Sequence, residues 1–366
     1  MIYALSIDWL SCFAMYMGTD DWQPRETDAF PFMYKTETFG TRVFKRFVRV
    51  RIANDEGGID DFAEIQAEPY SSILPTYAVI VRFVNRTLYL PNFWQLADAL
   101  FRANLFAFQS ISRVDICADF NDFASIAPSA LIEGFAAKKF RHVGRGVGAL
   151  YFNHGVGAER DKNDHPIKDY GVQYTGLSFG THASGAHVYL YNKSLELLTQ
   201  GEKPWIRDVW NNAGLDGRHV WRLEVSIKAE GMKFRDKATK KDIKIDDQMI
   251  SESSELDKIY HTFISRLFAF VRLPMKQKNI SREERIRLFD SKPAYDRGVI
   301  RNVSAGDRME RILIKTLHQL CDRYRGAGIY KLEEHSKELA NCLAYATDLH
   351  DWYEKKQTEW EKPIHK

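Results

Sequence analysis

The sequence lacks any apolar run long enough to cross a bilayer. A membrane-spanning helix needs about 20 consecutive apolar residues, and no segment of the 366-residue chain approaches that length. The opening stretch, MIYALSIDWLSCFAMYM, has neither the basic start nor the small-residue cleavage site of a secretion leader. We therefore expect a cytoplasmic protein with no membrane partner.

Cysteine is scarce and scattered. The four cysteines, Cys12, Cys117, Cys321 and Cys342, form no CxxC pair and stand at no histidine spacing that is typical of zinc. The sequence therefore predicts reduced, buried thiols rather than a zinc site or a disulfide framework.

A strong excess of charge of either sign is also missing. The 52 basic residues nearly balance the 49 acidic ones, and the net charge of +3 decides nothing about nucleic acid. Two segments concentrate cations, 44–52 and 232–245, and each is either a phosphate-contacting surface or a solvated edge. Their candidate DNA-contacting residues are Lys45, Arg49, Arg51, Lys233, Arg235, Lys240 and Lys241.

Short alternating runs dominate the first 230 residues. Such runs predict strands of a largely antiparallel sheet. Two segments with helical periodicity, 92–103 and 128–140, interrupt them, so the order predicts an α+β fold with flanking helices. The predicted strands cover 2–9, 43–52, 76–84, 113–120, 148–153, 173–179, 186–192 and 219–228.

Beyond residue 250 the apolar period becomes that of helices. Ser281 and Glu284 have the spacing of a capping box, which predicts a charged helix from Ser281 onward. The other predicted helices cover 256–271, 304–324 and 332–356. We expect a sheet domain over 1–250 and a mostly helical region over 251–366.

Three predicted strands carry ionisable side chains on one face and apolar side chains on the other, because side chains alternate along a strand. One solvent-facing strand would look the same, but three such strands together indicate a site. The three polar faces are Arg113, Asp115, Cys117 and Asp119; His187, Tyr189, Tyr191 and Lys193; and Arg222, Glu224, Ser226 and Lys228.

If these faces converge, they assemble the chemistry of a phosphodiester site. The carboxylates of Asp115 and Glu224, with Asp119 as a further candidate, are hard oxygen ligands suited to Mg²⁺ or Mn²⁺. A phenol beside them can attack phosphorus once a metal or another cation favours its ionised form. Spacing within one sequence does not show that the strands are neighbours.

Four blocks resemble, in this order, those of the replication initiation factor family. That family comprises rolling-circle plasmid initiators and the related relaxases of integrative conjugative elements. The blocks are IDWLSCF (7–13), SRVDICADF (112–120), LSFGTHASGAHVYLYNKSLEL (177–197) and WRLEVSIK (221–228), and the resemblance covers roughly residues 1–230. The YNK block combined with the later R-x-E-x-x-x-K block is the more specific feature.

The resemblance implies an endonuclease that nicks one strand at a replication origin. Such an enzyme becomes joined to the 5′ phosphate and leaves a 3′ hydroxyl for a polymerase. The family's tyrosine matches Tyr191, with Tyr189 on the same predicted face as the fallback nucleophile. Acidic residues matching Asp115 and Glu224 are implied as metal ligands. The implied partner is origin DNA, presented as a single strand or a cruciform at the nick site.

The cations of the three strands have several possible roles. Lys193 either stabilises the transition state, neutralises DNA or is a plain surface lysine. Arg113 and Arg222 either clamp phosphate or neutralise neighbouring carboxylates, and Lys228 is a further DNA-contacting candidate. His187 is expected to be an ordinary sheet histidine. For Asp8 in the first block, a structural and a catalytic role both stay open.

Two other functions stay open as well. A relaxase of a conjugative or mobilisable element would run the same chemistry at a transfer origin, and a non-catalytic regulator would bind DNA with the same fold. No second nucleophile can be matched, so termination is not predicted. The region after residue 250 is expected to recognise origin DNA, to form a homodimer or to recruit a host helicase.

Overall fold

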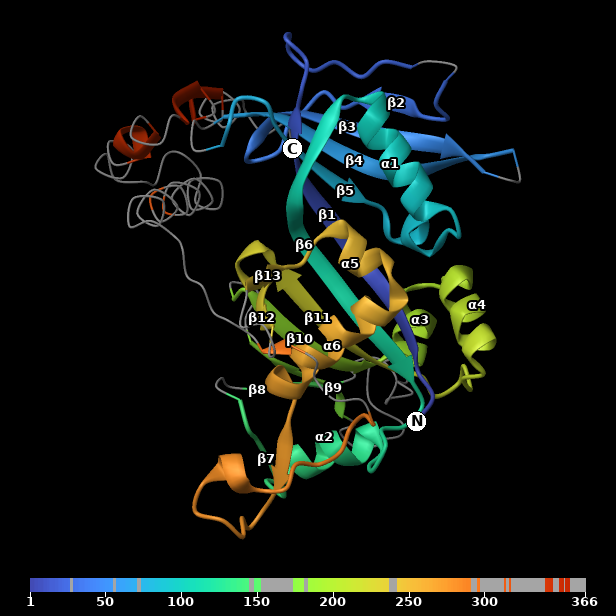
Figure 1. Cartoon of the computed structure of the whole chain (residues 1–366), viewed down its shortest axis with the longest axis vertical. Coiled ribbons are helices and arrows are strands. Elements are labelled where there is room, and N and C mark those ends of the chain that lie inside the picture. The colour runs from blue at the N-terminus through green and yellow to red at the C-terminus, as the bar shows by residue number, and fades with distance from the viewer. Residues whose placement is uncertain are drawn as a thin grey trace, which may run out of the picture. The chain divides into compact units, whose positions relative to one another are not determined.

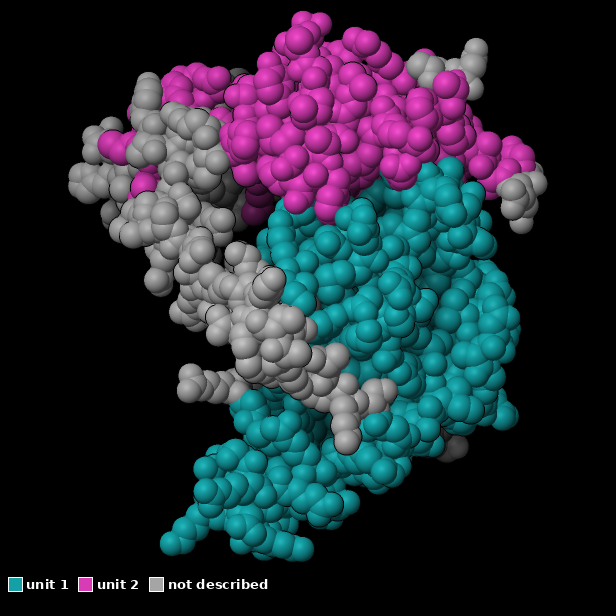
Figure 2. Space-filling view, in the orientation of Figure 1, with its two compact units in different colours: residues 1–12, 83–97, 110–300 teal, residues 13–82, 98–109, 301–366 magenta. Residues whose placement is uncertain are grey.

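The computed structural model describes most of the first 296 residues, and it divides into two compact units (Figure 2). Unit 1 comprises residues 1–12, 83–97 and 110–300, and unit 2 comprises 13–82, 98–109 and 301–366. The described ranges are 1–26, 29–54, 57–70, 74–144, 148–152, 174–180, 184–236, 242–290 and 295–296, with short helical pieces between 313 and 355.

A ten-stranded sheet contains strands of both units (Figure 1). Its order is β2-β3-β4-β5-β1-β6-β11-β10-β9-β8, and β1 (Ala4–Tyr16) and β6 (Phe106–Phe120) each contribute to both units. The pairings β2–β3, β3–β4, β6–β11, β11–β10, β10–β9 and β9–β8 are antiparallel. The predicted α+β class with a largely antiparallel sheet is confirmed.

Unit 1 holds the strands that carry the predicted site. They are β8 (Gly148–Phe152), β9 (Tyr174–Phe179), β10 (Ala186–Asn192) and β11 (Trp221–Lys228), beside the end of β6. Its helices are α2 (Pro128–Ala136), α3 (Lys193–Gln200), α4 (Pro204–Ala213), α5 (Asp247–Ser251) and α6 (Ser253–Leu267), with the 3-10 turn η1 (Asn85–Tyr89).

One face of this sheet is apolar and lies under α6 (Figure 1). The Tyr260 hydroxyl of α6 donates to the Leu223 carbonyl of β11 at 2.9 Å. Phe289 packs on Phe120 of β6, with ring centroids 5.8 Å apart, and equally on Tyr260. Phe120 belongs to the apolar set of β6, so the ionisable set points to the opposite face.

Helices α3 and α4 close one end of the ionisable face. Asn192 caps α3, because its side chain accepts a hydrogen bond from the Leu195 amide at 2.9 Å. Gly214 ends α4 with a left-handed φ of 70°. The buried residues that join these helices to the sheet are Ala4, Leu197, Ile206, Trp210, Leu215 and Val220.

Unit 2 is built on a sheet with its own buried side chains. The side chains of Val48, Val50, Phe62 and Val81 are fully buried, each at 0% exposure. The strands are β2 (Met33–Thr36), β3 (Phe44–Ala53), β4 (Ile59–Pro69) and β5 (Ala78–Phe83), and α1 (Phe93–Ala103) begins in unit 1 and ends in unit 2.

The helix predicted from Ser281 is wrong. Only a 3-10 turn, η3 (Ile280–Arg282), forms there, and the following residues lie extended beside β14 (Phe270–Arg272). The Ile286 amide donates to the Phe270 carbonyl at 2.8 Å, and the backbones of Arg285 and Val271 form an antiparallel β-bridge. Exposed arginines alternate there with buried Ile286 and Leu288, which is the period of a strand and outweighs the capping-box spacing.

The smaller elements complete the described part of the chain. Strand β14 pairs with β7 (Phe140–His142), and β12 (Lys233–Asp236) lies between β13 (Asp242–Lys244) and β15 (Tyr295–Asp296). The predicted helices 304–324 and 332–356 fall mostly outside the described residues. The domain boundary predicted after residue 250 falls within α5 and stays a prediction. Among described helices, none is long and apolar enough to cross a membrane.

Candidate active site

The sheet register brings the three predicted polar faces onto adjacent strands. Tyr191 of β10 lies opposite Arg222 of β11, which lies opposite Asp119 of β6. The next rows along the same face are Tyr189, Glu224 and Cys117, then His187, Ser226 and Asp115, then Lys228 and Arg113. Antiparallel pairing therefore supplies the convergence that sequence spacing could not show.

Tyr191 lies between a carboxylate and an ammonium group. Its hydroxyl donates to Glu224 Oε2 at 3.2 Å, and Lys193 Nζ donates to the same hydroxyl at 3.4 Å. Its ring stacks on Tyr189, with centroids 4.7 Å apart and planes at 25°. Burial raises the pKa of Tyr191 well above its usual value, and the Glu224 charge raises it further. At neutral pH the phenol is protonated and needs a base before it can attack.

Glu224 is suited to be that base. Burial raises its pKa to about 8, and the charges of Asp8 and Asp115 contribute to the shift. A carboxylate with a pKa near the working pH can accept a proton during the reaction and release it afterwards. The base and the proton it would accept are already joined by the hydrogen bond from Tyr191.

Lys193 is buried, at 1% exposure, so the surface-lysine alternative is wrong. It is the first residue of α3, and the turn from β10 into that helix directs its ammonium group back over the Tyr191 ring, 5.4 Å from the centroid. Glu196, one turn later on the helix, forms an ion pair with it. Lys193 is therefore placed to favour a phenolate at Tyr191.

Arg222 and Asp119 form a buried ion pair. Arg222 Nε and a terminal nitrogen donate to the two Asp119 oxygens at 2.6 and 2.8 Å, and Trp210 Nε1 donates to Asp119 at 2.7 Å. The Arg222 side chain is fully buried, with 0% exposure. Both residues were candidates for chemistry, Asp119 as a metal ligand and Arg222 as a catalytic cation. These contacts favour structural roles for both.

Asp8 joins the site from β1, although the sequence left its role open. Its Oδ1 accepts from the second terminal nitrogen of Arg222 at 2.5 Å and from the Tyr89 hydroxyl at 3.0 Å. Burial by itself raises the pKa of Asp8, but the charges of Arg222 and Lys193 outweigh that effect and hold the pKa well below its usual range. Asp8 is therefore an ionised carboxylate at the edge of the site.

Asp115 is held by Arg113. The guanidinium donates two hydrogen bonds to the carboxylate, at 2.9 and 2.5 Å, and lies over the Trp9 ring, 4.5 Å from its centroid. Burial raises the pKa of Asp115, while Arg113 partly counters the shift. This geometry assigns Arg113 the counter-ion role that the sequence left open beside phosphate clamping.

The carboxylates of Asp8, Asp115 and Glu224 fit a divalent cation by their chemistry. Their mutual repulsion raises the pKa of Glu224, and a cation among them would counter that repulsion and favour the ionised form of Glu224, which is the form that accepts a proton. Each carboxylate oxygen has two lone pairs, so the bonds from Arg113 leave Asp115 acceptor capacity. Within the described residues, however, no three acidic, histidine or cysteine side chains already stand at metal-binding spacing.

The basic strand predicted at 44–52 exists as β3, in unit 2, and its arginines have acidic partners. Arg49 pairs with Glu37 at 2.9 Å, and Arg51 pairs with Asp61 at 2.9 Å. Lys45 is exposed and lies over the Tyr70 ring at 5.9 Å. Of the second basic segment, Lys233 and Arg235 lie on β12, while Lys240 and Lys241 are outside the described residues.

The sequence did not predict a further basic surface, which we call the basic lobe. It combines the end of α2, strand β7, strand β14 and the segment up to residue 290. This surface carries nine exposed cations and only four carboxylates. A groove of about 420 Å³ runs through it, lined by Arg272, Lys276, Arg285 and Arg287 among others. The exposed cations are Lys138, Lys139, Arg141, Arg272, Lys276, Lys278, Arg282, Arg285 and Arg287, and the carboxylates are Glu133, Glu283, Glu284 and Asp290.

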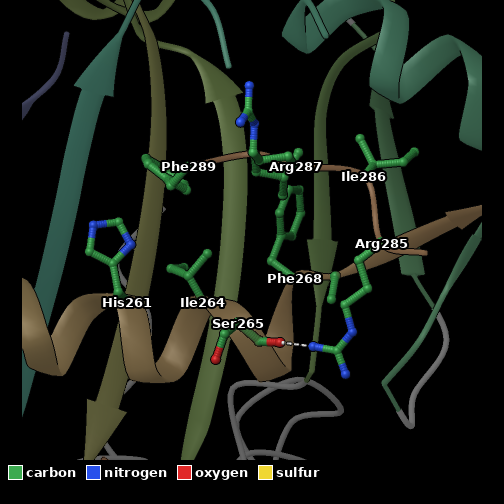
Figure 3. Close-up of a pocket in the computed structure, with 10 residues that line it drawn as sticks. His261, Ile264, Ser265, Phe268, Arg285, Ile286, Arg287 and Phe289 are labelled. Carbon is green, nitrogen blue, oxygen red and sulfur yellow. Dashed lines mark hydrogen bonds between the residues drawn. The ribbon is translucent and has the colours of Figure 1, made fainter. Parts of the chain in front are cut away.

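A smaller hollow of about 140 Å³ lies on the α6 side of the sheet (Figure 3). Figure 3 shows His261, Ile264 and Phe268 around it, with Arg285 donating to the Ser265 carbonyl at 3.0 Å. His261 also contacts the Tyr3 hydroxyl at 3.0 Å. This hollow is on the face opposite Tyr191 and takes no part in the site.

No protein-family model matches the chain, and no curated protein matches it. Among solved structures, the chain is similar to the rolling circle replication initiator protein from Geobacillus stearothermophilus. The sequence identity is 14% and the TM-score is 0.43, over 78% of this chain and 93% of that chain. The function of this chain therefore has to be argued from its own residues.

Proposed function

We propose that the chain is a DNA-nicking and strand-transferring endonuclease that initiates rolling-circle replication, with Tyr191 as its nucleophile. The observation that carries the proposal is the position of the Tyr191 hydroxyl, 3.2 Å from a carboxylate with a raised pKa and 3.4 Å from an ammonium group. A base and a cation that converge on one phenol are the requirements for activating it as a nucleophile.

The nicking step then follows from the contacts. Glu224 accepts the phenolic proton while the Tyr191 oxygen attacks phosphorus, and Lys193 stabilises the negative charge that develops on that oxygen. A bond forms between the phenolic oxygen and phosphorus, the bond from phosphorus to the 3′ oxygen breaks, and the 3′ oxygen takes a proton. The products are a 5′-phosphotyrosine link and a free 3′ hydroxyl.

We further propose that Asp8, Asp115 and Glu224 hold a divalent cation, Mg²⁺ or Mn²⁺, with Asp8 in place of Asp119. When bound, the ion would withdraw charge from a non-bridging phosphate oxygen. Asp8 is preferred because its carboxylate contributes to the raised pKa of Glu224 and is 20% exposed, whereas Asp119 is 1% exposed and accepts three hydrogen bonds from Arg222 and Trp210. Mn²⁺ binding measured by calorimetry should weaken in Asp8→Asn and remain in Glu196→Gln, the matched control.

The proposal predicts a covalent adduct that depends on one tyrosine. The purified protein is incubated, with Mn²⁺ or with EDTA, with labelled single-stranded oligonucleotides that tile the genetic element encoding it. The mixtures are then separated on a denaturing gel. We expect an adduct that requires the metal, is lost in Tyr191→Phe and survives in Tyr189→Phe. Tyr189 is the matched control because its ring stacks on Tyr191 and lies opposite Glu224.

Two outcomes would point to the alternatives. Tight binding without any adduct would support a non-catalytic DNA-binding regulator. An adduct at the transfer origin of a conjugative element would identify a relaxase, because the chemistry of the two enzymes is the same. A host helicase and a homodimer remain expected partners in either enzyme.

A further inference from the structure

We propose that Trp9 and Arg113 form a stacking platform for one nucleobase of the DNA strand, beside the carboxylates of the site. The inference rests on the DNA-nicking function proposed above and adds to it a contact with a base. The nicking step at Tyr191 involves only the phosphate and its ester oxygens. None of the residues assigned to that step contacts a base.

The Arg113 guanidinium is fixed in two directions. The guanidinium carbon lies over the Trp9 ring, 4.5 Å from its centroid, and Asp115 accepts two hydrogen bonds from the guanidinium, at 2.9 and 2.5 Å. A long cationic side chain ordinarily loses much rotamer freedom when it binds a ligand. Here that freedom is already restricted, so the planar group is preorganised.

Arg113 is the more accessible residue of its ion pair with Asp115. Its side chain is 36% exposed, whereas the Asp115 side chain beneath it is 4% exposed. Unpaired bases stack on aromatic rings and on arginine planes in proteins that bind single strands. A base on the outer face of Arg113 would complete three layers, with Trp9 at the bottom and Arg113 in the middle.

The contact with Arg113 brings Trp9 of β1 to the ionised face. Buried residues recur in β1 at Ala4, Ile7 and Leu10, so Asp8 and Trp9 lie together between them, both partly exposed. Asp8 reaches Arg222 and Trp9 reaches Arg113, and both partners belong to the ionised face.

The charges around the platform suit a DNA strand. Lys228 of β11 lies opposite Arg113 in the sheet register and adds a positive charge beside the platform. Asp115 keeps Arg113 from being a free phosphate clamp, which leaves its plane as the recognition surface. The platform lies on the same face as Tyr191, so the stacked base would belong to the strand that is cut.

The test is abasic scanning combined with substitution of the platform. The Tyr191→Phe protein in EDTA binds DNA without nicking, and fluorescence anisotropy gives Kd for the tightest-binding tiled oligonucleotide and for versions with one abasic site each. We expect one abasic position to weaken binding about 5- to 150-fold, the range for a single stacked base. Arg113→Lys, which keeps the charge and removes the plane, should weaken the intact oligonucleotide by a similar factor.

The proposal is decided by whether the effect of Arg113→Lys on Kd depends on the base at the sensitive position. We call this dependence the coupling. Arg113→Lys should have almost no further effect on the oligonucleotide that is abasic at the sensitive position. Trp9→Phe should keep the coupling and Trp9→Leu should lose it. If Arg113→Lys weakens every oligonucleotide by the same factor, the pair only positions Asp115 and the platform is wrong. An adduct at Tyr191 without this coupling would refute the platform alone, and coupling without an adduct would refute the nicking function alone.

Discussion

Strands β3 and β11 look alike in sequence but place their charges in different surroundings. Both alternate polar or charged residues with apolar ones, FKRFVRVRI in one and WRLEVSIK in the other. In β3 the pairs lie at the surface, because Arg51 and Asp61 are 36% and 38% exposed. In β11, Arg222 and its partner Asp119 are 0% and 1% exposed. Alternation therefore shows which side chains share a face but not whether water reaches that face.

The difference decides what each charge can do. An exposed ion pair contributes at most about 1 kcal/mol to stability, because water solvates both of its partners. A buried pair is costly to break, because the remaining charge keeps its desolvation penalty. The β11 pair therefore supports the framework that positions Glu224, whereas the β3 pairs leave the stability of the chain largely unaffected.

The largest expected effect is on Arg222. Arg222→Ala leaves Asp119 buried without its cation, so we expect the free energy of unfolding to fall by about 3–5 kcal/mol. The comparison with β3 predicts that Arg51→Ala costs less than about 1 kcal/mol. Urea unfolding followed by circular dichroism measures both, and equal losses would show that the two strands do not differ as the structure indicates.

Glu224 gives the second effect, which depends on pH. Its pKa is raised to about 8 in the folded chain, so between its ordinary pKa and about 8 the folded chain keeps a proton that the unfolded chain has lost. Stability therefore falls as the pH rises through that window. Glu224→Gln removes this penalty, so without metal and at pH 8 its free energy of unfolding should exceed that of the unsubstituted protein by up to about 4 kcal/mol.

At pH 5 the two proteins should differ much less, because most of the window lies above that pH. Urea unfolding in EDTA at the two pH values gives the comparison. A difference that does not change with pH would contradict the shifted pKa and, with it, the assignment of Glu224 as a base suited to neutral pH.

Much of the sheet and the three polar faces could be predicted because alternation is a local property. All eight predicted strands lie in the sheet, and Tyr191, Glu224 and Asp115 share a face. What could not be predicted depends on contacts that are distant in sequence. The burial of Arg222 depends on Trp210 and Asp119, and the position of Trp9 beside the site depends on its contact with Arg113.

The basic lobe was missed for the same reason. Lys138 to Arg141 and Arg272 to Arg287 are far apart in the chain, and each group alone is an ordinary charged surface. They become one surface only because β7 pairs with β14 and residues near Arg285 lie beside β14. The capping-box spacing at Ser281 also favoured a helix, on which Arg282, Arg285 and Arg287 would form a mixed solvated surface together with Glu283 and Glu284.

The smallest expected effect separates the lobe from β3 as DNA-binding surfaces. Replacing Arg272 and Lys276 with glutamine should weaken DNA binding and lower the slope of log affinity against log salt by about 1.4–1.8, if each cation contacts one phosphate. The paired arginines of β3, Arg49 and Arg51, should change that slope little when replaced in the same way, because Glu37 and Asp61 already neutralise them. Anisotropy titrations over a series of salt concentrations measure both slopes. If replacing Arg49 and Arg51 changes the slope more than replacing Arg272 and Lys276, the DNA contacts unit 2. The sequence-based prediction that Arg49 and Arg51 contact DNA would then hold.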